Sequence, residues 1–254
     1  MKIRILGCGT STGVPKIGNH WGQCDPSEPR NRRLRSSILV ESEDAHVLVD
    51  CGPDLRQQLL DAGVDRLEAV IVTHDHGDHV HGIDELRPVS QAMGRPVPLL
   101  GRQETLDSLG DRFAYAFVRS EFYRPIVAPG LLGQQWSFGG VTVRTIDQPH
   151  GTTSSVGLRF EKDNRSAIYA IDYSAMTGDM RTLYQGADVM ISDCLTRHPH
   201  PTHAHLDGVL AWARELQVSH LYLTHMGNGL DYRTLIDELP DWAEPAYDGQ
   251  EICL

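Results

Sequence analysis

Four short apolar runs in this 254-residue chain each lead directly into a histidine or an aspartate. The runs have the length and composition of buried β-strands. In open α/β sheets, ligands bind outside the carboxyl ends of the strands, where loops on a rigid scaffold converge. We therefore expect the four residues that end these runs to meet at one edge of a sheet structure: His74, His150, Asp172 and His225.

The rest of the chain predicts a layered α/β architecture with mixed sheets, because strand-like and helical patterns are interspersed without a simple alternation. We find no internal repeat and no interdomain linker, so residues 1–254 are expected to form a single domain. Asp163-Asn164 predicts a hairpin turn. The predicted strands are Ile3–Leu6, Ser37–Val40, His46–Val49, Ala69–Thr73, Val97–Leu100, Val141–Ile146, Val156–Phe160, Ala167–Ile171, Val189–Ser192 and His220–Thr224, and the clearest helices are Asp54–Ala62, Ile83–Met93, Leu206–Leu216 and Tyr232–Leu239.

Composition narrows the function classes. Hydrophobic residues make up 40% of the chain and the net charge is −11, so a globular protein that repels polynucleotides and anionic lipid is expected. No apolar run approaches the roughly 18 residues that span a bilayer, and residues 1–13 lack the apolar core of a secretory signal. We expect a cytoplasmic protein without membrane contact. Its five scattered cysteines do not indicate a disulfide framework, whereas its thirteen histidines favour metal binding or acid–base chemistry.

The strongest motif is Thr-His-Asp-His-Gly-Asp-His at residues 73–79, which places four potential metal ligands within six positions after a strand. A histidine-rich loop alone is typical of a solvated turn. Its coincidence with three further strand-end ligands instead favours a metal centre, because imidazole and carboxylate groups are ligands of Zn²⁺ and related ions. We predict His74, His76 and His150 on one ion, Asp78, His79 and His225 on a second, and Asp172 as the bridge between them.

These residues and their order resemble the metallo-β-lactamase superfamily, whose THxHxDH motif stands intact here. The resemblance implies an αββα sandwich of two mixed β-sheets flanked by helices, with a dinuclear metal site at one edge. It also implies two divalent ions per chain, with zinc, manganese and iron all compatible with the ligand types. Zinc β-lactamases commonly carry a cysteine where Asp172 stands, so antibiotic hydrolysis is not expected.

The opening at residues 6–15, LGCGTSTGVP, resembles the GTGxxxGVP start of the phosphodiesterase branch of this superfamily. Together with residues 76–87, HGDHVHGIDELR, and 31–37, NRRLRSS, it is similar to the phosphoribosyl cyclic phosphate phosphodiesterase group. The resemblance implies hydrolysis of a small cyclic, sugar or nucleotide phosphodiester by attack of a metal-bridged hydroxide. Small residues in the opening would let backbone N–H groups approach an anion. A glycine-rich segment taken alone, however, is usually just a tight turn that binds nothing.

Residues 197–205, RHPHPTHAH, hold four histidines before a predicted helix. The resemblance identifies His203 as the group that protonates the leaving alkoxide, beside Asp172 and Asp78 as further catalytic residues, and leaves His198, His200 and His205 as alternatives. The arginines of 30–35 form either a solvated face or a phosphate grip. Residues 112–125 are rich in aromatic side chains, which predicts core packing, a dimer contact or a lid.

Several alternatives stay open. The related phosphonate-pathway enzymes carry a zinc-binding cysteine cluster of which only Cys24 remains here, with Asn228 near the position of a late histidine ligand, so no structural third metal is expected. No basic arm like that of the tRNA-processing ribonucleases is present, so the expected partner is a small phosphodiester or a nucleotide and not a nucleic acid. A carboxylic ester, thioester or lactone hydrolase, a nucleotide-binding module without turnover, and a homodimer remain compatible with the sequence.

Overall fold

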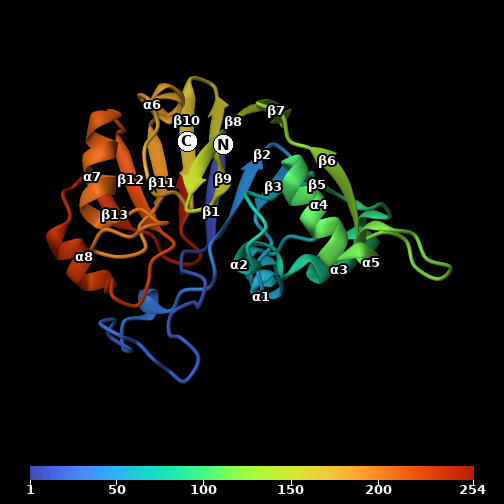
Figure 1. The fold of residues 1–254 in the computed structure, drawn as a ribbon, viewed down its shortest axis with the longest axis horizontal. Helices are drawn as coiled ribbons and strands as arrows, with labels where there is room; N and C mark the ends of the chain where they lie inside the picture. The colour runs from blue at the N-terminus through green and yellow to red at the C-terminus, as the bar shows by residue number, and fades with distance from the viewer.

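The computed structural model describes all 254 residues and consists of two seven-stranded mixed β-sheets with helices on their outer faces (Figure 1). This confirms the expected αββα sandwich. The first sheet has the order β14 (Glu251–Cys253), β1 (Lys2–Gly7), β2 (Ser37–Ser42), β3 (Ala45–Val49), β4 (Ala69–Ile71), β5 (Val97–Gly101) and β6 (Val127–Leu131). The second has the order β13 (Ala243–Pro245), β12 (His220–Thr224), β11 (Val189–Asp193), β10 (Arg165–Ala170), β9 (Thr153–Lys162), β8 (Val141–His150) and β7 (Gln135–Phe138).

Both sheets follow the same pairing pattern. Each has three antiparallel pairs followed by three parallel pairs, from β14 to β6 in the first sheet and from β7 to β13 in the second. Because parallel strands end at the same edge of a sheet, the residues that follow β3 and β4, and those that follow β10, β11 and β12, are delivered to common edges.

Alternation along the strands divides the apolar side chains between two cores. Ile38 and Val40 of β2 belong to the larger core cluster, which includes residues of both sheets, whereas Leu39 between them belongs to a second cluster beneath the helices of the first sheet. Successive side chains of a strand point to opposite faces, so one strand contributes to both cores. Each fully buried aliphatic side chain contributes about 1.5–3 kcal/mol of hydrophobic stabilisation.

Helices cover the outer face of each sheet. The second cluster contains helix side chains that pack under the first sheet: Leu55, Leu59, Leu106 and Leu109. The larger cluster contains Met180 and Val209 from helices that accompany the second sheet. On the side of the first sheet lie α1 (Leu55–Ala62), α2 (Gly77–Val80), η2 (Ile83–Glu85), α3 (Leu86–Met93), α4 (Gln103–Arg112) and α5 (Ala114–Phe117); α6 (Gly178–Tyr184), α7 (Leu206–Glu215) and α8 (Tyr232–Glu238) accompany the second sheet, and η1 (Pro29–Asn31) lies in the loop after β1.

All ten predicted strands are present, with some differences in their bounds. The predicted hairpin turn is also confirmed, since Asp163 and Asn164 adopt φ values of 51° and 63° between paired β9 and β10. The helix predicted at Ile83–Met93 is divided into η2 and α3, and α2, α4, α5 and α6 were not predicted. The strands β6, β7, β13 and β14 were also missed, because they have three to five residues each and lack a clear apolar alternation.

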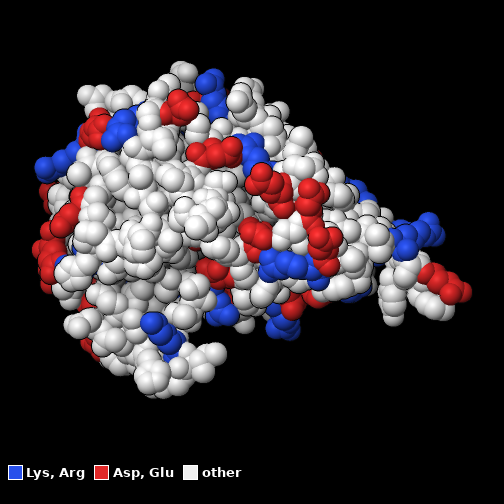
Figure 2. Space-filling view, in the orientation of Figure 1, with Lys and Arg blue, Asp and Glu red and all other residues white.

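No helix has the length and apolar character needed to cross a membrane. Acidic and basic side chains are interspersed on the face that Figure 2 shows, with a large uncharged area over the second sheet and its helices.

Candidate metal centre

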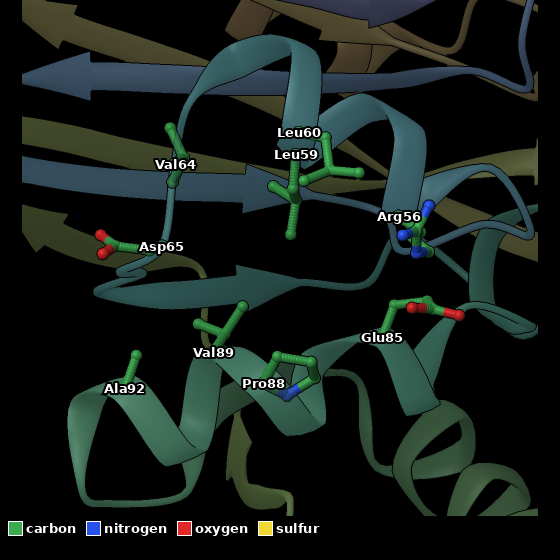
Figure 3. Close-up of a pocket in the computed structure, with 9 residues that line it drawn as sticks. All are labelled: Arg56, Leu59, Leu60, Val64, Asp65, Glu85, Pro88, Val89 and Ala92. Carbon is green, nitrogen blue, oxygen red and sulfur yellow. The ribbon is translucent and has the colours of Figure 1, made fainter.

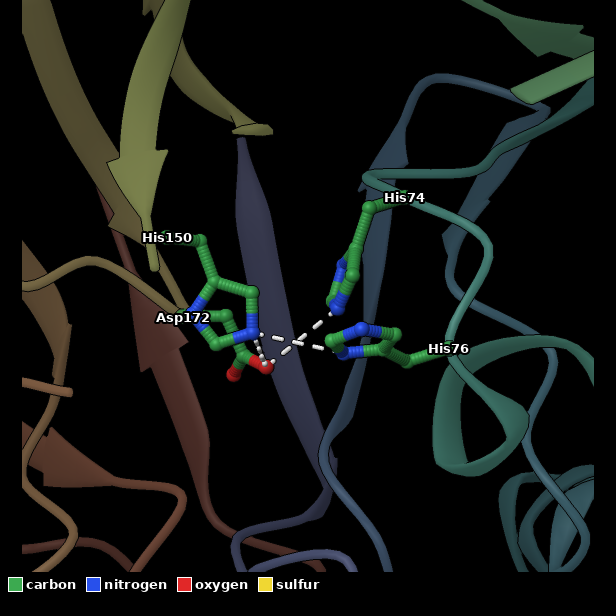
Figure 4. A group of neighbouring side chains, drawn as sticks. All are labelled: His74, His76, His150 and Asp172. Atoms are coloured by element: carbon green, nitrogen blue, oxygen red, sulfur yellow. Dashed lines mark hydrogen bonds and ion pairs between the residues drawn. The ribbon is translucent and has the colours of Figure 1, made fainter. Parts of the chain in front are cut away.

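The first group of predicted ligands comes together at the edge shared by the two sheets (Figure 4). Ligand atoms of His74, His76, His150 and Asp172 all lie within 4.8 Å of one another. Asp172 Oδ2 is 3.3 Å from His74 Nε2 and 3.4 Å from His150 Nε2. His76 Nδ1 lies 3.3 Å from His150 Nε2.

A second group, formed by Asp78, His79 and His225, adjoins the first and is equally tight. Asp78 Oδ2 lies 3.3 Å from His79 Nε2 and 3.4 Å from His225 Nε2. Asp172 reaches this group as well, because its Oδ1 is 3.3 Å from His225 Nε2 and its Oδ2 is 3.5 Å from His79 Nε2. The structure thus brings all seven predicted residues together, with Asp172 between the two groups.

The groups draw on both sheets. His74 follows β4, and the next three residues of the cluster lie at the start of α2 or within it. His150 is the last residue of β8, while Asp172 and His225 follow β10 and β12. Asp172 and His225 both have positive φ, 52° and 54°, a backbone conformation that non-glycine residues adopt at a cost of about 1–3 kcal/mol and that is concentrated at functional sites.

The donor atoms in this cluster fit a metal ion. His74 Nε2, His79 Nε2 and Asp172 Oδ1 are buried and have no hydrogen-bond partner. Buried polar atoms are almost always satisfied, so unpaired imidazole nitrogens and a carboxylate oxygen that face one another indicate a missing ligand. Imidazole and carboxylate are the donors that Zn²⁺, Mn²⁺ and Fe²⁺ accept.

Two buried aspartates that the sequence analysis did not single out hold the histidines in place. Asp50 Oδ2 lies 2.7 Å from His79 Nδ1, and the same carboxylate accepts hydrogen bonds from Thr73. Asp193 Oδ1 lies 3.5 Å from His225 Nδ1. A carboxylate on Nδ1 fixes the orientation of the ring and leaves Nε2 for a metal. Both residues stand at the carboxyl ends of strands, β3 and β11, so the signal that identified Asp172 could have found them.

Burial and neighbouring charges shift the pKa values of the titratable groups in this cluster. Burial alone would raise the pKa of Asp172, but the neighbouring His225 and His79 rings lower it well below its usual range. Burial would lower the pKa of His225, yet Asp172 and Asp193 raise it to about 10. Burial does lower the pKa of His150, to about 4. The close approach of imidazole rings therefore favours the ionised form of Asp172.

His203 lies beside both groups. Its ring stacks on His225 with centroids 5.0 Å apart and meets His150 edge-on at 4.9 Å. Its Nδ1 is 2.9 Å from Asp193 Oδ2, and its side chain is 14% exposed. Of the three alternatives in the same loop, His198 and His200 are exposed and His205 is the residue that precedes α7. Only His203 has its ring against the predicted ligands.

The glycine-rich opening packs tightly and does not offer a row of free N–H groups. The N–H groups of Cys8, Gly9, Thr10 and Gly13 donate to Asp248, Leu34, Met226 and Thr10 respectively. A Cβ on Gly7 would lie 2.1 Å from the carbonyl oxygen of Arg35, so glycine is required there by close chain approach. The tight turn is therefore observed, and the approach of an anion to this segment stays a prediction.

The arginines of residues 30–35 are mostly engaged within the protein. Arg33 is buried and donates to Asn31 Oδ1 and to the carbonyl oxygens of Gly227 and Leu230. Arg35 pairs with Asp54, with Nη1 and Oδ2 3.2 Å apart. Arg30 lies over the rings of Tyr232 and Tyr247, and Arg32 over Trp21. Arg33 and Arg35 are therefore used within the protein, whereas Arg30 and Arg32 are exposed and the phosphate grip stays a prediction for them.

The aromatic segment 112–125 has two parts. Phe113 and Phe117 pack against the second core cluster, whereas Tyr115, Phe122 and Tyr123 are exposed. Asp75 ties the metal loop to the start of this segment, because it accepts a hydrogen bond from Ser108 Oγ at 2.6 Å and pairs with Arg112.

One cavity adjoins the ligand cluster, and a second lies away from it. A polar pocket of about 330 Å³ adjoins His74 and is lined by Arg102, Gln103 and Asp147 among others. A mainly apolar groove of about 430 Å³ runs between α1 and α3 (Figure 3), with Leu59, Leu60 and Val89 on its walls. The groove contains none of the predicted site residues.

Two facing mixed sheets with a histidine and aspartate cluster at their common edge define a metallohydrolase class of protein. A family model described as the beta-lactamase superfamily domain matches residues 45–226, and the chain belongs to this superfamily. This confirms the resemblance stated from the sequence.

Proteins similar to this chain carry out different reactions. A solved structure of a diphosphatase from the PhnP family is 33% identical with a TM-score of 0.89, over 99% of this chain and 96% of that one. A ribonuclease Z of Bradyrhizobium diazoefficiens is 31% identical over 68% of this chain and 60% of the relative. An octanoyltransferase of Porphyromonas gingivalis is 29% identical over 99% of this chain, which spans only 51% of that relative.

Proposed function

We propose that this protein is a metal-dependent phosphodiesterase that hydrolyses a small phosphodiester, with a cyclic sugar or nucleotide phosphate as the preferred substrate. The observation that carries the proposal is the pair of ligand groups that share Asp172, with His203 beside them. Sites with two metals a few ångströms apart are recurrent in phosphoester hydrolysis.

The proposal assigns His74, His76 and His150 to one divalent ion, Asp78, His79 and His225 to the other, and Asp172 to both. When bound, such ions supply Lewis acidity toward a phosphoryl oxygen and lower the pKa of coordinated water. Asp50 and Asp193 keep the His79 and His225 rings oriented, since each carboxylate faces Nδ1 of its histidine.

His203 is the proposed general acid. Its Nδ1–H donates to Asp193, so Nε2 of the protonated ring carries the proton that can pass to a leaving alkoxide. The ring is partly exposed beside His150, and His76, which also lies against His150, is exposed, so His203 and His76 both lie on the accessible side of the ligand cluster. Asp193 stabilises the protonated ring and retains its orientation after the proton has left.

The preference for a small substrate rests on charge and on similarity. The net charge of −11 disfavours a polynucleotide, and two arginines of the run 30–35, Arg33 and Arg35, are occupied by intramolecular contacts. The similarity to a PhnP-family diphosphatase over nearly the whole of both chains supports a small phosphate ester. A ribonuclease Z relative supports phosphodiester chemistry in general.

The test is a substrate screen with the purified protein after metal removal and reconstitution with Zn²⁺ or Mn²⁺. We expect close to two ions per chain by elemental analysis and hydrolysis of bis-p-nitrophenyl phosphate and of a five-membered cyclic phosphate of ribose. Asp172→Ala and His76→Ala should lose most of this activity. Fewer than one bound ion per wild-type chain, or normal turnover by Asp172→Ala, would contradict the proposal.

A second candidate is acyl ester or thioester hydrolysis, which the similarity to an octanoyltransferase favours. The same screen should therefore include an octanoyl thioester and a lactone. A kcat/KM for the thioester above that for every phosphodiester would replace the phosphodiesterase assignment with an acyl hydrolase.

A further inference from the structure

A buried polar network lies directly behind Asp172 and none of its members is a predicted ligand. Ser155 Oγ lies 2.8 Å from the carbonyl oxygen of Asp172 and 2.9 Å from that of Ile171. Gln148 Nε2 donates to Ser155 Oγ and to the same Ile171 oxygen, both at 2.9 Å. Tyr184 Oη donates to Gln148 Oε1 at 2.8 Å.

The directions of these hydrogen bonds are fixed by chemistry. A carbonyl oxygen can only accept, so the amide group of Gln148 that faces Ile171 must be its NH₂. Its oxygen then faces Tyr184, whose hydroxyl must donate. Ser155 accepts from Gln148 and donates its single proton to the two backbone carbonyls. The donor or acceptor role of each atom is therefore fixed, and an alternative arrangement would leave a buried donor or acceptor unsatisfied.

The network is fully enclosed. Gln148 and Ser155 are 1% exposed and Tyr184 is 0% exposed. Gly157 provides the space, since a Cβ at this position would lie 1.7 Å from Tyr184 Oη and 2.6 Å from Gln148 Oε1. Three polar side chains and one glycine therefore form the contact with the backbone carbonyl groups of Ile171 and Asp172.

That piece of backbone is the one that needs support. Asp172 has a φ of 52°, in the left-handed region, which costs an L-residue conformational energy that contacts from the surroundings offset. Gln148 lies two residues before His150 on β8, and in a strand residues two apart point to the same face. The network consequently joins the strand that carries one predicted ligand to the backbone of the residue that touches both ligand groups.

We propose that Gln148, Ser155 and Tyr184 are positioning residues that hold Asp172 in the conformation needed to bridge two metal ions. They act through the Asp172 backbone and touch no substrate. The inference rests on the proposed function for the identity of the ligands, but its test measures metal affinity directly and does not depend on which ester is hydrolysed.

The experiment compares Ser155→Ala, Tyr184→Phe and Gly157→Ala with the control Ser42→Ala. Ser42 is also a buried serine, 5% exposed, that donates to a carbonyl oxygen, that of Gly139, far from the ligands in the fold. Apparent Zn²⁺ affinity is measured for each reconstituted protein by competition with a chromophoric chelator, alongside the Tm of the metal-free protein.

We expect Ser155→Ala and Gly157→Ala to weaken Zn²⁺ binding by about 10- to 100-fold, the usual effect of losing the groups that orient metal ligands. Tyr184→Phe should weaken it less, because it acts one hydrogen bond further away. Ser42→Ala should lower the Tm without changing the affinity. The inference is wrong if Ser155→Ala and Ser42→Ala lower the Tm alike and both bind Zn²⁺ as tightly as wild type. If the wild-type protein itself binds no Zn²⁺, the proposed function fails first.

Discussion

At the scale of single residues, the centre depends on side chains that are held from behind. Asp50 orients His79, Asp193 orients His225 and His203, and the Thr202 carbonyl oxygen accepts from His150 Nδ1 at 2.8 Å. The contacts on His79, His203 and His150 are hydrogen bonds to Nδ1 that direct Nε2 into the site, whereas Asp193 faces His225 Nδ1 at the longer distance of 3.5 Å. His203 shares this arrangement but is not among the predicted ligands, which suits a ring that exchanges a proton.

His203→Ala should lower kcat by about 10²–10⁴-fold, the usual contribution of general acid catalysis, while two metal ions remain bound. The matched control is His198→Ala, which removes an exposed histidine from the same loop. Steady-state kinetics and elemental analysis of both variants check the prediction. Loss of metal from His203→Ala would show that the ring is a ligand, and a slow His198→Ala would move the acid role to another histidine.

At the scale of elements, side-chain caps stand at the starts of two outer helices, α6 and α8. Asp231 caps α8 by accepting from Thr234 N at 2.9 Å, and it also accepts from Asp25 N and Asn31 Nδ2. Burial would raise the pKa of Asp231, but these hydrogen bonds lower it to about 2. The cap thus links α8 to the loop after β1, and it is stronger when Asp231 is ionised.

Asp231→Ala should lower the free energy of unfolding by about 1–2 kcal/mol at neutral pH. Because the folded pKa lies below the unfolded value of about 3.9, the stabilisation is complete above pH 4 and is lost as the pH falls toward 2. Urea denaturation at pH 7 and at several values below pH 4 should show the difference from wild type shrinking.

The control for this prediction is Thr177→Ala, which removes the uncharged cap of α6, where Thr177 accepts from Met180 N. Its effect should not change with pH over the same range. A pH-independent loss for Asp231→Ala would mean that its charge does not contribute to the cap.

At the scale of the whole molecule, the candidate centre joins the two sheets. Four predicted ligands come from the loop after β4 and three from the ends of β8, β10 and β12. The complete ligand set exists only in the folded protein, so a metal ion held at this edge binds the native state and not the unfolded chain. Metal binding therefore adds directly to the free energy of unfolding.

Removal of metal with a chelator should lower the Tm, and restoring Zn²⁺ should reverse the change. At free metal about 100 times Kd the stabilisation is about 2.7 kcal/mol, which for a chain of this size corresponds to a shift of roughly 5–11 °C. Thermal unfolding monitored by circular dichroism measures it. Asp172→Ala should show a much smaller shift, and an equal shift in that variant would place the stabilising ion elsewhere.

The sequence by itself determined which residues meet at the site. Strands that run in the same direction have their carboxyl ends on the same side of a sheet, and ligands bind outside those ends. Four of the site residues were therefore predictable from their places after apolar runs: His74, His150, Asp172 and His225. The same periodicity gave ten strands and the hairpin at Asp163-Asn164, because strand and turn patterns are local.

Only the tertiary structure decided what supports those residues and how the remaining polar groups are used. Arg33 contacts the carbonyl oxygen of Gly227, 194 residues away, and Tyr184 contacts Gln148, 36 residues away, so neither partner is encoded by nearby residues. The arginines of residues 30–35 have a composition that fits a phosphate grip equally well, and for Arg33 and Arg35 the contacts with Leu230 and Asp54 select another use. Pattern fixes the direction in which a side chain points, whereas its partner depends on which distant segment the fold brings against it.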